Sequence, residues 1–105
     1  MILFVDDKKK PEEFGLDSRQ IHYVRTVKDA ATLASENYYH IMYIDHDLGG
    51  KIDGSQMLAR FCASHRVPDK VFCISCNPIG IKRIEGVCND YDIEFEDIGY
   101  KTNTN

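Results

Sequence analysis

The chain has 105 residues and a mass of 12.1 kDa, which is enough for one compact domain. Its 17 acidic and 13 basic residues give a formal charge of -4, which argues against coating a nucleic-acid backbone, because that needs a large basic face. Hydrophobic residues make up 43% and charged residues 29%, which excludes wholesale disorder, and the longest apolar runs are too short to span a membrane. Since Met1 already belongs to an apolar strand pattern, no signal peptide is expected, and we predict a soluble cytoplasmic domain.

The chain before residue 39 predicts two strands and one full helix. Residues 2–5 form a continuous apolar run, which is typical of a buried parallel strand. Residues 8–15 leave room for a short helical turn only. Residues 21–25 alternate apolar and polar side chains and are predicted to be a strand with one wetter side. Thr26 is expected to cap the helix that follows. The apolar stripe of that helix is Ala30, Leu33 and Ala34.

The rest of the chain, from residue 39 on, predicts three more strands and two helices. The strands are expected at residues 39–44, 70–74 and 93–95. Asp53 is expected to cap a helix that ends near residue 65, rather than to bind a ligand. Asn77 is expected to cap the last helix, because Pro78 suits a first helical turn.

Strands that alternate with helices predict right-handed crossovers and a parallel sheet. The first, third and fourth runs are apolar on both sides, whereas the second and fifth contain His22 and Glu94 and are expected at the edges. This pattern predicts an α/β, flavodoxin-like three-layer sandwich with strand order 2-1-3-4-5. We expect residues 1–99 to form this domain and residues 100–105 a polar tail, with the last helix truncated or absent.

The cysteines allow several interpretations. An even count of four permits two disulfides, but no secretory signal supports an oxidising compartment. Cys73 and Cys76 have the spacing of a metal or redox pair, yet Cys73 lies within an apolar run, where a thiol packs as a small hydrophobe. We favour buried core thiols over a zinc or redox site. The four are Cys62, Cys73, Cys76 and Cys88.

Two pairs of carboxylates follow the strands that flank the switch point of the predicted sheet. Asp6 and Asp7 follow the first strand, and Asp45 and Asp47 follow the third. Ligands of such sheets bind at the carboxyl ends of the strands, so these acids are expected to converge. Converging carboxylates repel one another and need a cation, and hard oxygen ligands favour Mg²⁺. Because Mg²⁺ leaves positions open for phosphate oxygens, the pattern predicts phosphoryl chemistry.

Other polar residues lie on the same expected rim, each with a simpler alternative. Ser75 and Asn77 follow the fourth strand, although Asn, like Asp, often only forms turns and caps. One lysine of residues 8–10 is near enough to face a phosphate, unless the run is only solvated. His46 is either a general acid/base near neutral pH or a strand-end residue that points into solvent or core. Arg25 either faces a phosphate or pairs with a carboxylate.

These residues resemble the receiver domain of two-component signalling, from residue 1 to about residue 98. Asp6 and Asp7 resemble the acidic metal pair, Asp45 stands at the phospho-accepting aspartate, and Ser75 takes the place of the switch hydroxyl. A receiver also carries a lysine at the end of its fifth strand. Here the corresponding residues 94–97 read Glu-Phe-Glu-Asp, and most of the last helix is missing.

A divergent group, the cyclic-phosphate-processing receiver family, is the closer resemblance. The family's acidic pair and the basic residue that follows it are similar to Asp6-Asp7 and Lys9 here. Its Arg-Thr pair before a helix is similar to Arg25-Thr26. It contains strings similar to residues 45–49, Asp-His-Asp-Leu-Gly, and to Asp53-Gly54. Its His-Ser-x-Asn segment corresponds to residues 74–77, with Ile74 in place of the histidine. The family is proposed to act on cyclic phosphate ends in RNA repair or conflict settings, often in phages and mobile elements.

The leading hypothesis is a Mg²⁺-dependent phosphoesterase or phosphohydrolase that acts on a phosphate-bearing small molecule or RNA end, such as a 2′,3′-cyclic phosphate. Asp45 would be either a nucleophile or a metal ligand beside an activated water. His46 would transfer the proton. The expected metal ligands are Asp6, Asp7 and Asp45, assisted by Asp47. The residues expected to neutralise or hydrogen-bond the phosphoryl oxygens are Lys9, Arg25, Ser75 and Asn77.

Two other functions remain open from the sequence. The missing strand-five lysine, last helix and histidine favour a non-catalytic receiver-like module that binds a protein partner, for example a phage-encoded modulator of a host factor. The other possibility is a phosphoacceptor receiver that is modified on Asp45. None of the three requires a membrane or extended nucleic-acid binding.

Overall fold

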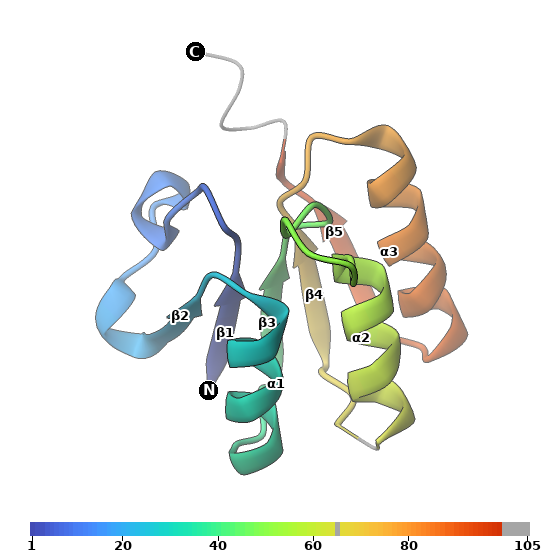
Figure 1. Ribbon diagram of the computed structural model, residues 1–105, viewed down its shortest axis with the longest axis horizontal. Helices are drawn as coiled ribbons and strands as arrows, with labels where there is room; N and C mark the ends of the chain where they lie inside the picture. Colours follow the sequence, from blue (N-terminus) through green and yellow to red (C-terminus); the bar gives the residue numbers. More distant parts are fainter. Residues whose placement is uncertain (65, 100–105) are drawn as a thin grey trace.

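The computed structural model, which describes residues 1–64 and 66–99, contains one parallel sheet of five strands (Figure 1). The strands are β1 (Ile2–Val5), β2 (Ile21–Val24), β3 (Ile41–Ile44), β4 (Lys70–Cys73) and β5 (Glu94–Asp97). Their order is β2-β1-β3-β4-β5, and every neighbouring pair is parallel. The flavodoxin-like sheet predicted from the sequence is therefore confirmed, with β2 and β5 at its edges.

Three α-helices and two short 3₁₀ segments connect the strands: η1 (Pro11–Phe14), η2 (Ser18–Gln20), α1 (Val27–Glu36), α2 (Gly54–Ala63) and α3 (Pro78–Asp90). The three predicted helix caps are confirmed, because the side chains of Thr26, Asp53 and Asn77 each accept a backbone N–H of the first turn. Within the described ranges, no helix is long and apolar enough to cross a bilayer.

Two strands begin later than their apolar sequence predicts. β3 begins at Ile41, because Tyr39 is instead buried beside β2, with its hydroxyl 2.6 Å from His22 Nδ1. β5 begins at Glu94, because the Ile93 N–H donates to the Cys88 carbonyl (2.8 Å) and so belongs to the turn that ends α3. Hydrogen bonds at the chain reversals, rather than hydrophobicity, set these boundaries.

The sheet separates two apolar clusters. All three α-helices contribute to one cluster, whose strand residues include Leu3, Met42 and Val71. The other cluster is built on Phe4 and Tyr43, with further apolar side chains from residues 14–16 packed against it. The third layer of the sandwich, on the face opposite the α-helices, is thus formed by η1 and the residues that follow it, near the β2 edge (Figure 1). No helix follows β5 as far as Gly99, and the predicted tail at 100–105 lies outside the described residues.

Three of the cysteines are core residues, as the sequence predicts. Cys62, Cys73 and Cys88 are buried, and burial raises the pKa of the Cys73 and Cys88 thiols to about 12. These thiols therefore stay protonated and unreactive near neutral pH. Cys76 differs because it is exposed, at the carboxyl end of β4.

Two glycines of α3 provide a matched test of packing. A Cβ on Gly80 would lie 2.4 Å from the His46 ring, whereas a Cβ on Gly86 would meet nothing within 4 Å. Gly80→Ala is therefore expected to lower the free energy of unfolding by about 1–3 kcal/mol through overpacking. Gly86→Ala is expected to raise it by about 0.5–1 kcal/mol through helix propensity. Urea unfolding measures both, and equal effects would contradict the close contact.

Candidate functional site

The register of β1 against β3 brings the acidic residues together. Val5 pairs with Ile44, so Asp6 and Asp45 leave neighbouring strands at the same level. The Asp45 N–H donates to the Val5 carbonyl at 3.0 Å, which holds the two strand ends in place. One carboxylate oxygen from each of Asp6, Asp7 and Asp45 lies within 4.8 Å of the others.

Within residues 1–64 and 66–99, two carboxylate oxygens in this group are buried without a hydrogen-bond partner. They are Asp6 Oδ2 and Asp7 Oδ1, while Asp6 Oδ1 accepts the Lys8 N–H at 2.9 Å. Desolvation raises the pKa of Asp6, and it raises the pKa of Asp45 to about 7 with the charge of Asp6 adding to the effect. Buried carboxylates that lack donors match the oxygen ligands of a divalent cation, so these residues fit Mg²⁺.

A cleft of about 180 Å³ opens beside the acidic group. Its lining residues are Asp6, Lys8, Lys9, Asp45, Asp47, Ser75, Cys76 and Asn77. Asp47 lies at the outer edge with an exposed side chain, and its Oδ2 is 3.4 Å from Asn77 Nδ2. Asp47 is not among the three residues whose oxygens meet within 4.8 Å.

Lys9 follows β1, and its side chain extends across to the carboxyl end of β4. Its Nζ donates to the Ile74 carbonyl at 3.1 Å and lies 3.2 Å from Cys76 Sγ. No lysine lies on β5, whose acidic Glu94 and Glu96 instead pair with Lys70 of β4 at 3.2 Å each. The cation nearest to the β4 end of the cleft therefore comes from the loop after β1.

Ser75 and Asn77 are tied to each other by the turn between β4 and α3. Ser75 is buried, and its Oγ accepts the Asn77 N–H at 3.0 Å. Asn77 Oδ1 accepts the Ile79 N–H at 3.1 Å as the helix cap, which leaves its Nδ2 directed at Asp47. Both predicted residues thus line the cleft, but the oxygen of Asn77 is already in use.

His46 and Arg25 are not among the residues that line the cleft. The His46 ring is 6% exposed and lies against Gly80, with Nε2 3.3 Å from Asp53 Oδ2 and Nδ1 3.4 Å from Asp47 Oδ1. The ring is therefore buried between the loop after β3 and the starts of α2 and α3. Arg25 is exposed and donates from Nη2 to the Asp7 carbonyl oxygen at 2.6 Å.

Asp53 acts as the helix cap that the sequence predicts. Burial disfavours its charge, but hydrogen bonds from the Gln56 N–H and the Ser55 hydroxyl outweigh burial and hold its pKa below the usual value. Its charge therefore faces His46 at neutral pH.

Sequence reasoning missed the close backbone contacts around the cleft. A Cβ on Gly54 would lie 2.0 Å from the Asp45 carbonyl oxygen, and one on Gly99 would lie 2.2 Å from the Ser75 carbonyl oxygen. Cys76 was also not predicted to line the site, and two of the lysines at residues 8–10, Lys8 and Lys9, line it where one was expected to face a phosphate. A glycine directly after a helix cap, as at Gly54, is the available signal for such an approach.

Several solved structures resemble this fold. A signal receiver domain of an HD domain-containing protein from Pseudomonas fluorescens has a TM-score of 0.68 and 19% identity, covering 91% of this chain and 73% of that one. NtrX from Brucella abortus, in complex with ADP, has a TM-score of 0.69 and 20% identity, covering 97% of this chain and 24% of that one. The BeF3-activated DrrB receiver domain has a TM-score of 0.65 and 14% identity, covering 97% of this chain and 86% of that one. These structures show that the chain has the fold of a receiver domain.

The sequence defines the family within that class. The model of the family described as "Cyclic-phosphate processing Receiver domain" matches residues 1–90, from β1 through α3. The chain belongs to this family. A comparison with curated proteins found no match.

The raised pKa of Asp45 predicts a pH-dependent stability. Its carboxyl binds a proton more tightly when folded (pKa about 7) than when unfolded (3.8), so ionisation opposes folding. The penalty is absent below about pH 4, grows as the pH rises through this window and is complete above about pH 7. Asp45→Asn is therefore expected to stabilise the metal-free protein at about pH 8 by on the order of 1–2 kcal/mol, allowing for solvent screening.

Urea unfolding with a chelator present, at about pH 4 and about pH 8, measures this difference. Asp90→Asn, at an exposed position at the end of α3, is the control and is expected to change little at either pH. An equal effect of Asp45→Asn at both pH values would contradict the buried charge.

Proposed function

We propose that this chain is a Mg²⁺-dependent phosphoesterase that hydrolyses a phosphate end, such as the 2′,3′-cyclic phosphate of an RNA end or of a nucleotide. The observation that carries the proposal is the group of three carboxylates beside a cleft that Lys9 and Ser75 also line. The description of the family supports the choice of a cyclic phosphate as substrate.

Asp6, Asp7 and Asp45 would hold the cation, with Asp47 at the rim of the same cleft. When bound, Mg²⁺ would offset the carboxylate charges and polarise a phosphoryl oxygen. Among the three ligands, Asp6 and Asp7 each contribute a buried oxygen that has no donor in the part of the chain that the structure describes.

Hydrolysis adds one water across a ring P–O bond. The water oxygen bonds to phosphorus, one ester bond breaks, and its oxygen leaves with a proton to give a phosphomonoester. Asp45 would accept the proton of the water. Lys9 would stabilise the charge that develops on the phosphoryl oxygens, and Ser75 Oγ would donate to one of them.

We assign His46 and Arg25 positioning roles. The His46 ring fills the space between Gly80, Asp47 and Asp53, and so supports the loop that follows Asp45. Arg25 holds the Asp7 backbone through its carbonyl oxygen. Direct proton transfer by His46 stays a prediction.

A phosphoacceptor function is the second candidate. The receiver fold favours it, because Asp45 follows β3 and Lys9 lines the same cleft. In that case Asp45 would attack an acyl phosphate, the P–O bond to the carboxylate leaving group would break, and an aspartyl phosphate would form. A non-catalytic binding module is the remaining alternative.

The hydrolase is tested with a 2′,3′-cyclic nucleotide and Mg²⁺, followed by phosphorus NMR. We expect conversion to the phosphomonoester, and loss of at least about 100-fold in rate for Asp45→Asn. Asp90→Asn is the matched control with normal turnover. Calorimetry is expected to show Mg²⁺ binding that Asp6→Asn weakens. Normal turnover by Asp45→Asn would contradict the assignment.

Lys9 gives a second, independent test. Lys9→Ala is expected to lower the rate by about 10²-fold while Mg²⁺ binding remains, because its charge acts on the phosphoryl group. Lys10→Ala, one residue away and exposed, is the control. If no variant or condition gives turnover, mass spectrometry after acetyl phosphate treatment distinguishes the phosphoacceptor, which gains one phosphoryl group on Asp45, from the binding module, which gains none.

A further inference from the structure

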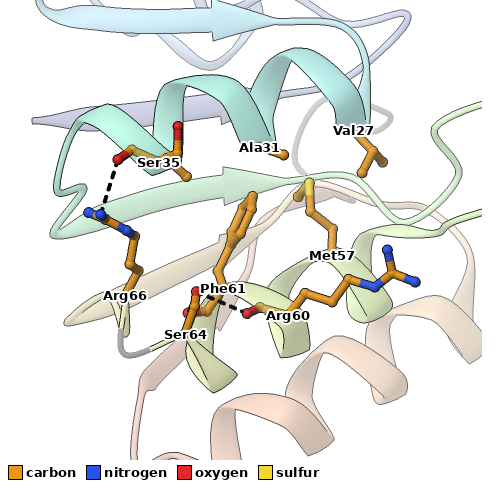
Figure 2. Close-up of a pocket in the computed structure, with 9 residues that line it drawn as sticks. Val27, Ala31, Ser35, Met57, Arg60, Phe61, Ser64 and Arg66 are labelled. Carbon is orange, nitrogen blue, oxygen red and sulfur yellow. Dashed lines mark hydrogen bonds between the residues drawn. The ribbon is translucent and has the colours of Figure 1, made fainter.

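A second concave surface lies between α1 and α2 (Figure 2), and its loop end comes close to the acidic group, since a Cβ on Gly49 would lie 3.4 Å from Asp7 Oδ2. It consists of two hollows of about 320 Å³ and 500 Å³ that share Val27, Ala31 and Arg60. We call this continuous surface the α1–α2 groove. One hollow runs towards Arg66, and the other runs towards the loop at residues 48–52. No residue lines both the groove and the acidic cleft.

Small side chains on α1 create the groove. Ala31 and Ser35 face α2, while Met57 and Phe61 project from α2 towards α1 (Figure 2). Because alanine and serine do not fill the space above these larger side chains, a hollow remains between the helices. One end is closed where Arg66 Nη2 donates to the Ser35 carbonyl at 3.1 Å.

The groove carries an excess of positive charge around an apolar floor. Among the described residues that line it, the charged ones are Lys28, Lys51, Arg60 and Arg66, and none is a carboxylate. Within residues 1–64 and 66–99, none of these four cations has a carboxylate oxygen within 4.0 Å. Such a concentration is unexpected in a chain with a net charge of -4.

We propose that the α1–α2 groove docks an acidic amphipathic helix of a partner protein. The apolar side chains of that helix would enter the groove, and its carboxylates would meet the four cations. α1 has 10 residues and is therefore about 15 Å long, which matches two to three turns of a bound helix. The proposal does not depend on the phosphoesterase activity, because it uses none of the residues of the acidic cleft.

The lining favours a peptide over a nucleic-acid strand. Bound single strands stack their bases on exposed aromatic rings. Phe61 is the aromatic residue among those that line the two hollows, and it is only 6% exposed. The groove therefore offers basic side chains but no exposed ring on which bases could stack. A single-stranded nucleic acid would be held there by its phosphates alone.

The proposal is tested with a set of fluorescent peptides that carry leucine at positions i, i+3, i+4 and i+7 and glutamate elsewhere. Fluorescence anisotropy is expected to show binding at about micromolar Kd for at least one of them. NMR shift changes are expected to concentrate on α1, α2 and residues 48–52. A scrambled peptide of the same composition and a labelled single-stranded RNA are the comparison probes.

Two variants separate the contributions of charge and shape. Lys51→Glu with Arg60→Glu is expected to weaken binding by about tenfold or more, whereas Lys10→Glu with Lys82→Glu, of equal charge change outside the groove, is not. Ala31→Leu is expected to block the groove while helix propensity keeps the fold stable. Ala63→Leu, on an exposed position of α2, is its control.

Binding of an acidic amphipathic peptide that both Ala31→Leu and the charge reversal weaken supports the proposal. It is overturned if no peptide of the set binds, if the scrambled peptide binds equally, or if the shift changes fall outside the groove. Preferential binding of the RNA to the groove also overturns it.

Discussion

The repulsion among three carboxylates at the ends of β1 and β3 is the constraint around which the site is organised. Parallel pairing of the two strands forces Asp6 and Asp45 together, and burial removes the water that would screen them. The chain offsets this cost only in part, with the Lys8 N–H and the charge of Lys9. The remaining cost is reflected in the pKa of Asp45, which is raised to about 7, and in two buried carboxylate oxygens that have no donor among the described residues. A bound cation would relieve both.

Packing at the glycines explains how such a crowded site keeps its shape. Gly54 and Gly80 let α2 and α3 approach the loop of residues 45–47, so the buried His46 ring is enclosed from two helices. The same helical layer behaves differently on its other side. Against α2, α1 presents alanine and serine, and the space that these small residues leave becomes the α1–α2 groove. Close packing at Gly54 and Gly80 thus supports the acidic cleft, whereas small side chains on α1 leave the α1–α2 groove.

Much of the fold and part of the site could be predicted from the sequence. Apolar runs and alternation gave the five strands, and cap residues gave the starts of the three helices. The convergence of Asp6, Asp7 and Asp45 followed from the rule for the carboxyl ends of parallel strands. The placement of His46 did not, because a histidine between two acids has the same sequence signature whether its ring faces the cleft or the core.

The sequence by itself determined the strand order, the helix starts and the identity of the acids, because local periodicity, capping and topology rules depend on neighbours along the chain. Only the tertiary structure decided that Lys9 reaches the carboxyl end of β4, that Asp47 lies at the rim and that the groove between α1 and α2 is basic. These features depend on side-chain reach and on residues far apart in sequence. No local pattern encodes the distance between Lys9 and Ile74, since it is set by the packing of β1, β3 and β4 into one sheet.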